Sequence, residues 1–345
     1  MDWRDIINVK EIATYIKELP PQMLIGESLF PRTKQLGMEL KYIKGAKQKP
    51  VVLKQSTFDV AVKIRALKAQ VDEITKQMPF FKESVLINEK DRQDLLLAMQ
   101  ADNKNIINMI VSNIFDNYKF LVDGGDMQME RMRMQLLADA GVISIISEDG
   151  DIVFDFGVPS DHKEVLSGTA KWSDTENSNP VKDIIRWVRK MKEDGYVVNR
   201  AILDETTFGW ITANKNIINS AFPNNPNYMA SDEEIKKFIK DKTGVAFAAV
   251  SGSYKLEDGT EQPYFTKGKF TLIPTGSLGK TYYGTTPEEA DKMFGNSDNV
   301  QIVRTGIAVM TMKKDDPVTV QTKVSQLGMP SFERADECFF ATVAE

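Results

Sequence analysis

The chain has 345 residues, of which 42% are hydrophobic and 27% are charged, a balance typical of a folded globular protein. Its formal net charge of −5 argues against a protein that grips nucleic acid through a generally basic surface, so any contact with DNA should be local or indirect. The apolar runs are too short to cross a bilayer, so no membrane contact is expected. The start of the chain lacks a secretory signal, and the single cysteine cannot form an internal disulfide, which favours a reducing cytosol.

Residues 1–36 are predicted to be a loosely organised N-terminal arm. A short amphipathic stretch from Ile6 to Ile16 leads into Pro20-Pro21, a pair that cannot continue a helix. We expect no independent core here.

Residues 37–62 are predicted to form a β-hairpin. Met38–Lys44 partly alternates, Gly45–Pro50 has turn chemistry, and Val51–Leu53 is rich in β-prone residues. The hairpin carries a basic tip formed by Lys41, Lys44, Lys47 and Lys49. Composition alone favours a solvated end kept soluble by lysines, and it leaves open a loop that lies on an acidic surface of a neighbouring subunit.

Residues 88–141 are predicted to be helical, because apolar residues between Ile106 and Leu121 recur with the spacing of one buried stripe. The pair Gly124-Gly125 is expected to kink or break this helix. A second stretch, whose methionines we interpret as core filling, should end at Gly141 in a left-handed cap.

The rest of the chain mixes strands and helices. The stretch 142–157 predicts strand, tight turn and strand, and further strands are expected at 244–250, 264–273, 300–312, 317–325 and 337–344. Asn179-Pro180 predicts a helix start, as do two capping boxes that begin at Ser231 and Thr286. The predicted class is therefore α+β.

Few residues are suited to catalysis. The only histidine, His162, lies in a polar stretch and is interpreted as a surface residue. Cys338 lies in a predicted strand with apolar neighbours and is interpreted as an unreactive core residue. A metal site built on several histidines is excluded, and the acidic turn at 148–151 lacks the ligand spacing of a calcium loop. We predict no catalytic, cofactor-binding or metal-binding residues and no cofactor.

One segment is similar to a phosphate-binding loop. A predicted strand at 269–273 is followed by Pro274–Thr281, which ends in Gly279-Lys280-Thr281. The first glycine of the motif is replaced by Pro274, which has no N–H to offer a phosphate, and the following residues do not open a helix. A nucleotide-binding enzyme that uses this segment is kept as an alternative.

Several short motifs follow one another from Met78 to the C-terminal strand. They are Met78–Glu83 before Leu86–Asn88, Glu130-Arg131, Leu136–Gly141, Val153–Gly157, Trp172–Asp174, Pro180–Ile184, Leu272–Gly279, Tyr283–Glu288, Asp316–Val320 and Met329-Pro330. In this order they resemble the lambda-type major capsid proteins of tailed bacteriophages, capsid family E. Each motif alone is weak, and their order carries the resemblance.

The resemblance implies the Hong Kong 97-like capsid fold, with its parts in the following places. They are an N-terminal arm (1–36), an extended β-hairpin or E-loop (37–78), a peripheral domain with a long spine helix (79–175), an axial domain (176–300) and peripheral strands (301–345). In this setting Lys41, Lys44, Lys47 and Lys49 become candidates for contacts between subunits. Some relatives join subunits by a lysine–asparagine isopeptide bond, but no motif here matches it and none is predicted.

The implied function is structural: a virion protein, not an enzyme, that is made in the host bacterial cytoplasm. It self-assembles into the pentamers and hexamers of an icosahedral head shell around double-stranded DNA, without reading its sequence. Scaffolding, decoration and portal proteins are the further partners that the resemblance suggests. Two further alternatives are considered. One is a shell of the same fold that encloses cargo proteins, and the other is a different virion protein, such as a tail tube.

Overall fold

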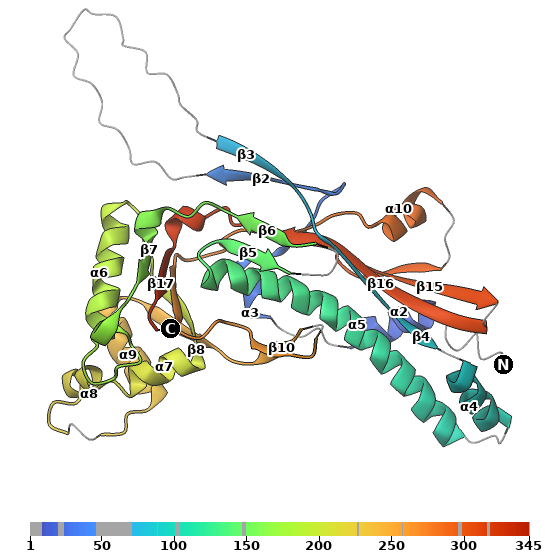
Figure 1. Cartoon of the computed structure of the whole chain (residues 1–345), viewed down its shortest axis with the longest axis horizontal. Coiled ribbons are helices and arrows are strands. Elements are labelled where there is room, and N and C mark those ends of the chain that lie inside the picture. The colour runs from blue at the N-terminus through green and yellow to red at the C-terminus, as the bar shows by residue number, and fades with distance from the viewer. Residues whose placement is uncertain are drawn as a thin grey trace, which may run out of the picture. The chain divides into compact units, whose positions relative to one another are not determined.

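The computed structural model describes residues 9–19, 24–45, 71–87, 89–100, 104–146, 150–225, 228–256, 258–295, 299–315 and 318–344 (Figure 1). The chain divides into two compact units, each built from separate stretches of sequence. Unit 1 comprises Met1–Leu40, Thr75–Arg133 and Gly279–Ser331, and unit 2 comprises Lys41–Ile74, Met134–Leu278 and Phe332–Glu345.

Unit 1 is organised around a six-stranded sheet with β16 at its centre. Its strands are β1 (Arg32–Lys34), β4 (Phe80–Ile87), β13 (Thr281–Tyr283), β14 (Val300–Arg304), β15 (Ile307–Asp315) and β16 (Val318–Pro330). Strand β16 pairs antiparallel with β15, with β4 and with β13, while β1 runs parallel to β13. The strands expected at 300–312 and 317–325 are present, with a turn at Thr305-Gly306 that splits the first into β14 and β15.

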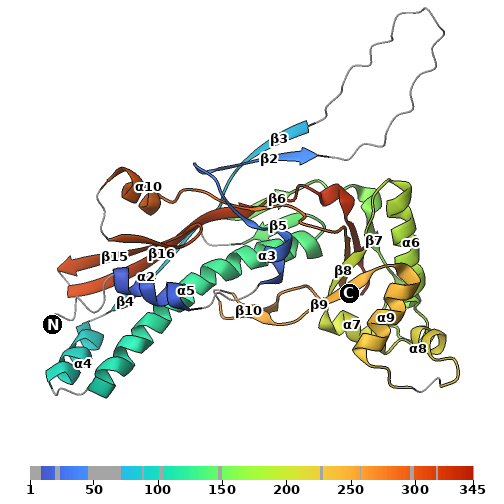
Figure 2. The same cartoon turned by 180° about the vertical axis from the view of Figure 1, so that it is seen from behind.

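Unit 1 also contains helices, several of which pack on this sheet. They are α2 (Val9–Glu18), α3 (Ile25–Leu29), α4 (Glu89–Gln100), α10 (Pro287–Phe294) and α5 (Lys104–Ala138), whose last residues belong to unit 2. The buried stripe of α2, which includes Ile12 and Ile16, shares one core with Val122 of α5 and with β15 and β16. The views from both sides show α2 beside α5 (Figures 1 and 2). This stretch of the expected loose arm is therefore a helix packed on the sheet.

Helix α5 runs without interruption through Gly124-Gly125, so the expected break is wrong. The reason is tertiary packing. A Cβ on Gly125 would lie 3.1 Å from the side-chain oxygen of Gln326 and 3.6 Å from Ile307, so glycine permits the helix to approach the sheet closely. The end of the helix agrees with the prediction: Gly141 has a φ of 82°, and its N–H donates to the carbonyl of Leu136.

Unit 2 contains a mixed five-stranded sheet in the order β7-β17-β12-β8-β9. These strands are β7 (Lys163–Val165), β8 (Arg200–Asp204), β9 (Ala246–Val250), β12 (Lys269–Ile273) and β17 (Phe339–Thr342). The strands expected at 244–250, 264–273 and 337–344 are thus present in shorter form, whereas β8 was not predicted.

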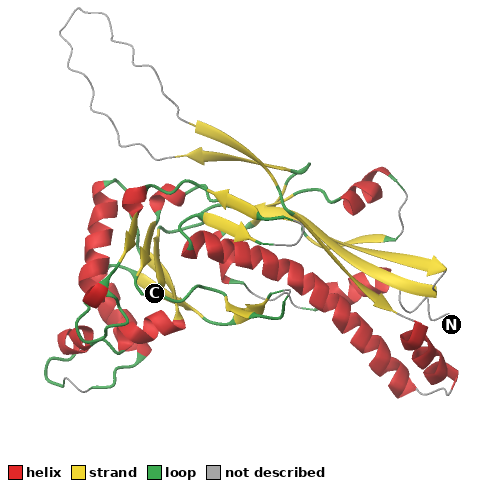
Figure 3. Cartoon of the chain, viewed as in Figure 1, coloured by secondary structure: helices red, strands yellow, loops and turns green. Residues whose placement is uncertain are grey.

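Four α-helices accompany this sheet in unit 2: α6 (Pro180–Glu193), α7 (Glu205–Thr212), α8 (Lys215–Ala221) and α9 (Asp232–Thr243), shown in red beside the yellow strands (Figure 3). Asn179 caps α6 by accepting from the N–H of Lys182, as predicted. Ser231 and Glu234 form the predicted capping box of α9.

Large aromatic side chains fill the core of unit 2. Trp187 stacks on Phe339 with ring centroids 5.5 Å apart, and Trp172 meets Phe270 edge to face at 5.0 Å. Burial of such rings is the main source of stability for a domain of this kind.

Three two-stranded ribbons complete the described structure: β2 (Glu39–Gly45) with β3 (Val71–Gln77), β5 (Val142–Ile145) with β6 (Ile152–Asp155), and β10 (Ser253–Lys255) with β11 (Glu261–Pro263). The β5–β6 hairpin confirms the predicted strand, turn and strand. The first strand of the predicted hairpin at 37–62 is β2, and its described partner is β3; residues 46–70, with the expected turn and return strand, lie outside the described residues. Among the described helices, none combines the length and apolarity needed to span a membrane.

Candidate assembly surfaces

The N-terminal segment Ile25–Lys34 is fixed to helix α5 by partly buried ion pairs within unit 1. The guanidinium of Arg32 donates to both oxygens of Glu27, at 2.7 and 2.8 Å, and its remaining nitrogen lies 3.0 Å from a carboxylate oxygen of Asp126 on α5. This planar, two-pronged geometry holds the segment in one register.

The turn between β14 and β15 reaches the same carboxylates. Arg304 donates from one nitrogen to Asp123, at 3.1 Å, and to Asp126. Asp123 also accepts from Lys119, one helical turn earlier, at 2.5 Å. Asp126 therefore joins the N-terminal segment, the helix and the sheet.

A second buried pair lies further along α5. Arg133, which is fully buried, lies 3.1 Å from Glu130 and donates to the hydroxyl of Thr281 at 2.9 Å. Glu130 also accepts from the backbone N–H of Gly26 at 2.6 Å. A Cβ at Gly26 would lie 2.6 Å from Glu130 and 2.9 Å from Arg133, so only glycine permits this approach.

The two glutamates of this network have opposite electrostatics. The hydrogen bond from Arg32 lowers the pKa of Glu27, despite partial burial. Burial raises the pKa of Glu130, and the Gly26 N–H and Arg133 only partly offset it. The hydrogen bond from Arg32 therefore favours the charged form of Glu27, whereas burial favours the neutral form of Glu130.

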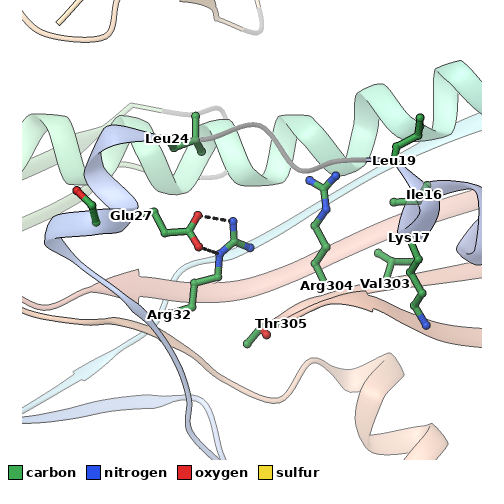
Figure 4. Close-up of a pocket in the computed structure, with 10 residues that line it drawn as sticks. Ile16, Lys17, Leu19, Leu24, Glu27, Arg32, Val303, Arg304 and Thr305 are labelled. Atoms are coloured by element: carbon green, nitrogen blue, oxygen red, sulfur yellow. Dashed lines mark hydrogen bonds and ion pairs between the residues drawn. The ribbon is translucent and has the colours of Figure 1, made fainter.

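A cavity of about 620 Å³ lies beside this network in unit 1 (Figure 4). It is lined by Ile16, Lys17, Leu19, Leu24, Glu27, Ser28, Arg32, Val303, Arg304 and Thr305. Glu27, Arg32 and Arg304 are paired within the chain, and the described lining has neither a histidine nor a cysteine. Among the lining residues that the structure describes, these paired groups do not form a nucleophile with an adjacent base.

Between residues 105 and 124, the exposed residues of α5 that the structure describes are uncharged. They are Asn105, Ile106, Asn108, Met109, Ser112, Asn113, Asn117, Phe120 and Gly124. Met109 is 58% exposed and Phe120 is 68% exposed. A helix face that stays in water normally carries charged side chains, whereas the centres of protein interfaces are depleted in them. This face has the composition of a protein contact.

The predicted basic contact residues lie in and after the β2–β3 ribbon. Lys41 is exposed on β2. Lys44 belongs to β2, but its side chain is not among those that the structure describes, and Lys47 and Lys49 lie outside the described residues. The structure therefore shows the β2–β3 ribbon, and the role of these lysines stays a prediction.

The segment similar to a phosphate-binding loop has a structural role. The hydroxyl of Thr281, which would ligate a metal in such a loop, is buried; it donates to the carbonyl of Phe30 and accepts from Arg133. Lys280 and Ser331 exchange hydrogen bonds through the Lys280 backbone. Strand β13 begins at Thr281, where a phosphate-binding loop would need a helix.

In unit 2, the preceding turn presents carbonyl oxygens to two arginines. Arg200 donates to the carbonyls of Pro274 and Gly276, and Arg334 donates to those of Thr275 and Ser277. A phosphate would need N–H groups in their place. The nucleotide-binding alternative is therefore not favoured.

His162 is buried, with 3% of its surface exposed, so the interpretation as a surface histidine is wrong. It follows Asp161 at the end of a short 3-10 helix (Ser160–His162), packs edge to face on Tyr196, and its Nε2 lies 3.5 Å from Asp194. Asp161, His162 and Asp194 are close enough to share a metal ion, but Lys190 already places its ammonium 3.0 Å from Asp161 and 2.9 Å from Asp194. This lysine supplies the positive charge of the cluster.

Cys338 is fully buried, and burial raises the pKa of its thiol well above the usual range. A thiol in this environment is a poor nucleophile at neutral pH, which agrees with the interpretation as inert packing.

The family of the protein follows from its sequence match. The model of the family "Phage major capsid protein E" matches residues 8–343. The chain belongs to this family. No curated protein matches it. The membership indicates a structural protein of the phage head and confirms the resemblance seen in the sequence motifs.

Solved structures of low sequence identity share the fold of this capsid protein. A structure assigned as a prophage capsid protein, from E. coli CFT073, is 14% identical with a TM-score of 0.60, and the match covers 98% of this chain and 99% of that one. A phage-related protein from Bordetella bronchiseptica RB50 is 13% identical over 98% of each chain, with a TM-score of 0.55. The capsid of cyanophage A-1(L) is 10% identical, with coverage of 94% and 95% and a TM-score of 0.51.

The sequence prediction missed the buried network, although part of a signal was present. Asp123, Asp126, Glu130 and Arg133 follow one another at steps of three and four residues, so they share one face of α5 with buried Met129. A charged stripe on the apolar face of a helix indicates buried pairs. The partners Arg32 and Arg304 gave no such signal, because only the fold brings them to α5.

Proposed function

We propose that this protein self-assembles, through pentamers and hexamers, into the icosahedral head shell of a tailed bacteriophage and encloses its double-stranded DNA. The observation that carries the proposal is the family match over residues 8–343. Capsid structures of the same fold support it. Repeated head-to-tail contacts that close into rings generate capsomers of this kind.

The domain roles follow from the same proposal. Residues 1–36 act as the arm, 37–78 as the E-loop, 79–175 and 301–345 as the peripheral domain, and 176–300 as the axial domain. The β2–β3 ribbon falls within the E-loop range, α5 within the peripheral range and α6 to α9 within the axial range, which supports the assignment.

Contacts between copies use the surfaces that a single chain leaves uncovered. The uncharged outward face of α5, with Met109 and Phe120, supports burial against another copy. The lysines at positions 41, 44, 47 and 49 contact acidic groups of a neighbouring copy. The buried network holds the N-terminal segment in place, so that capsomers form from a rigid unit.

The remaining roles concern the virion as a whole. The protein is made in the host cytoplasm, and its assembly partners include scaffolding, decoration and portal proteins. It encloses DNA without reading its sequence, in keeping with a net charge of −5.

The test is expression of the chain alone, followed by negative-stain electron microscopy and sedimentation. Closed shells or rings with five and six members are expected; co-expression with a scaffolding protein is the second arm. A chain that remains monomeric in both arms contradicts the proposal.

The content of purified native particles separates this function from a cargo-enclosing shell. Nuclease-resistant duplex DNA inside the particles is expected. Protein cargo without DNA would point to the alternative shell, and filaments or stacked rings would point to a tail protein.

A further inference from the structure

Helix α6 in unit 2 presents a basic face to its surroundings. Lys182, Arg189 and Lys192 are exposed and follow one another at i, i+7 and i+10, so they share one side of the helix. The opposite side buries Trp187 and Met191 in the core. The helix is therefore fixed in rotation, and its basic face points permanently outward.

Within the part of the chain that the structure describes, the cations of this face take no part in ion pairs. Among the described residues, Lys182, Arg189 and Lys192 have no carboxylate partner. Their neighbours on the same helix do. Arg186 pairs with Glu164 at 2.6 Å and Asp183 at 3.0 Å. Lys190 likewise bridges two aspartates. The helix thus separates cations that stabilise the fold from cations that do not.

Cations outnumber acids on this face. Glu193, which is exposed and lies four residues after Arg189, shares the face and already takes part in an interaction. Helix α9 provides the contrast, because its exposed Lys237 and Lys240 alternate with Glu233 and Asp241. On a chain with a net charge of −5, a local surplus of positive charge is where a polyanion would be attracted.

We propose that the basic face of α6, defined as Lys182, Arg189 and Lys192, contacts the phosphate backbone of duplex DNA. The proposal rests on the proposed function and places this face on the DNA side of the shell. The cations span about 15 Å at a rise of 1.5 Å per residue. Cations held in a row on one helix can lie along the regularly spaced phosphates of a duplex. Such contacts are electrostatic and do not depend on the base sequence.

An acidic surface on a second copy is less favoured as the partner. Lysine is depleted in protein interfaces, and stable interfaces are built around apolar anchors. The basic face offers only Ile185, which is 36% exposed, between its cations. Electrostatic contact with DNA needs no such anchor.

The test measures binding of a short, fluorescently labelled duplex by fluorescence anisotropy over a series of salt concentrations. The full-length chain is compared with the triple variant K182Q/R189Q/K192Q. The matched control, K237Q/K240Q/K242Q on α9, loses the same amount of charge. We expect the K182Q/R189Q/K192Q variant to bind about tenfold more weakly at low salt, with a salt dependence reduced by about 2 to 3 in slope, whereas the control should resemble the wild type. Circular dichroism melting verifies that the variants fold.

Two results would overturn the inference. One is a salt slope that is the same in the wild type and the K182Q/R189Q/K192Q variant, including the case in which neither binds DNA. The other is a variant that binds DNA normally but no longer assembles, which would assign the face to an acidic surface of a second copy. Electron microscopy of the same samples separates failure of this inference from failure of the proposed function. If only the inference fails, the wild-type chain still forms shells.

Discussion

Helices α5 and α6 distribute charge in opposite ways. On α5, the side chains of Asp123, Asp126, Glu130 and Arg133 are paired within unit 1, while the described exposed residues between 105 and 124 are uncharged. On α6 the inward side is aromatic and aliphatic, and the outward face is basic. A buried pair is costly to break and fixes geometry, whereas an exposed cation contributes little to folding and stays available to a partner.

The largest effect on stability is expected from Arg133→Ala. The substitution leaves Glu130 buried with only the Gly26 N–H as a partner, so the free energy of unfolding should fall by about 3–5 kcal/mol. Urea denaturation followed by circular dichroism measures the change. Arg189→Ala on α6 is the matched control, with an expected change within about 0.5 kcal/mol. If Arg133→Ala lowers the free energy of unfolding by less than about 1 kcal/mol, the charges of α5 do not stabilise the fold more than those of α6.

The second effect concerns assembly. Met109→Glu with Phe120→Glu places charge on the uncharged face of α5 and should abolish shells and rings, because a buried unpaired carboxylate costs several kcal/mol. The folded chain should keep its melting temperature, since both side chains are exposed. Lys237→Glu with Lys240→Glu on α9 adds the same acids and should assemble normally. Particles of normal yield from the α5 variant would show that this face is not a contact.

A smaller effect depends on pH through Glu27. Its pKa is lowered in the folded protein, so the pair with Arg32 stabilises fully above the unfolded-state pKa, about 4.3, and this stabilisation is lost as the pH falls through the folded-state value. Glu27→Gln should cost less than about 1 kcal/mol at pH 7, because the side chain is one-third exposed, and the cost should vanish in acid. Urea titrations from pH 7 to pH 3 give both values.

Glu130 serves as the internal comparison for this experiment. Its pKa is raised by burial, so its contribution is complete below the unfolded-state pKa and is lost as the pH rises through the folded-state value. The stability of the wild type relative to Glu130→Gln should therefore fall with rising pH, opposite in sign to Glu27. The same slope in both variants would contradict the assigned causes.

The smallest effect is expected for the triple variant of the basic face on α6. Lys182, Arg189 and Lys192 pair with no described group, so their replacement by glutamine should change the free energy of unfolding by less than about 0.5 kcal/mol. A loss above about 2 kcal/mol would show that the fold itself uses this charge.

Local chemistry determined which elements could be predicted from the sequence. The caps at Asn179 and Ser231 depend on side chains within three residues, and the structure has both. The period-two pattern of 142–157 likewise gave the β5–β6 hairpin. Strand β8 was missed, since Ala201-Ile202-Leu203 is too short an apolar run to indicate its type.

Errors arose where tertiary contacts override local preference. Helix α5 continues through Gly124-Gly125, and at Gly125 the missing side chain leaves room for Ile307 and Gln326 of the sheet. His162 is buried although its neighbours in sequence are polar, because Tyr196 and Asp194 enclose it. The buried network could not be found as a whole, because it joins residues from three distant segments of unit 1.

Strand β16 also affects the order of events during synthesis. It pairs with β4, where Val320 lies opposite Ile87, and with β13, where Met329 lies opposite Tyr282. The sheet of unit 1 therefore stays incomplete until residues near the C-terminus have left the ribosome, and such non-local pairing makes folding slow. A nascent chain consequently lacks a finished unit 1 with which to join other copies, so assembly between copies waits for the synthesis of β16.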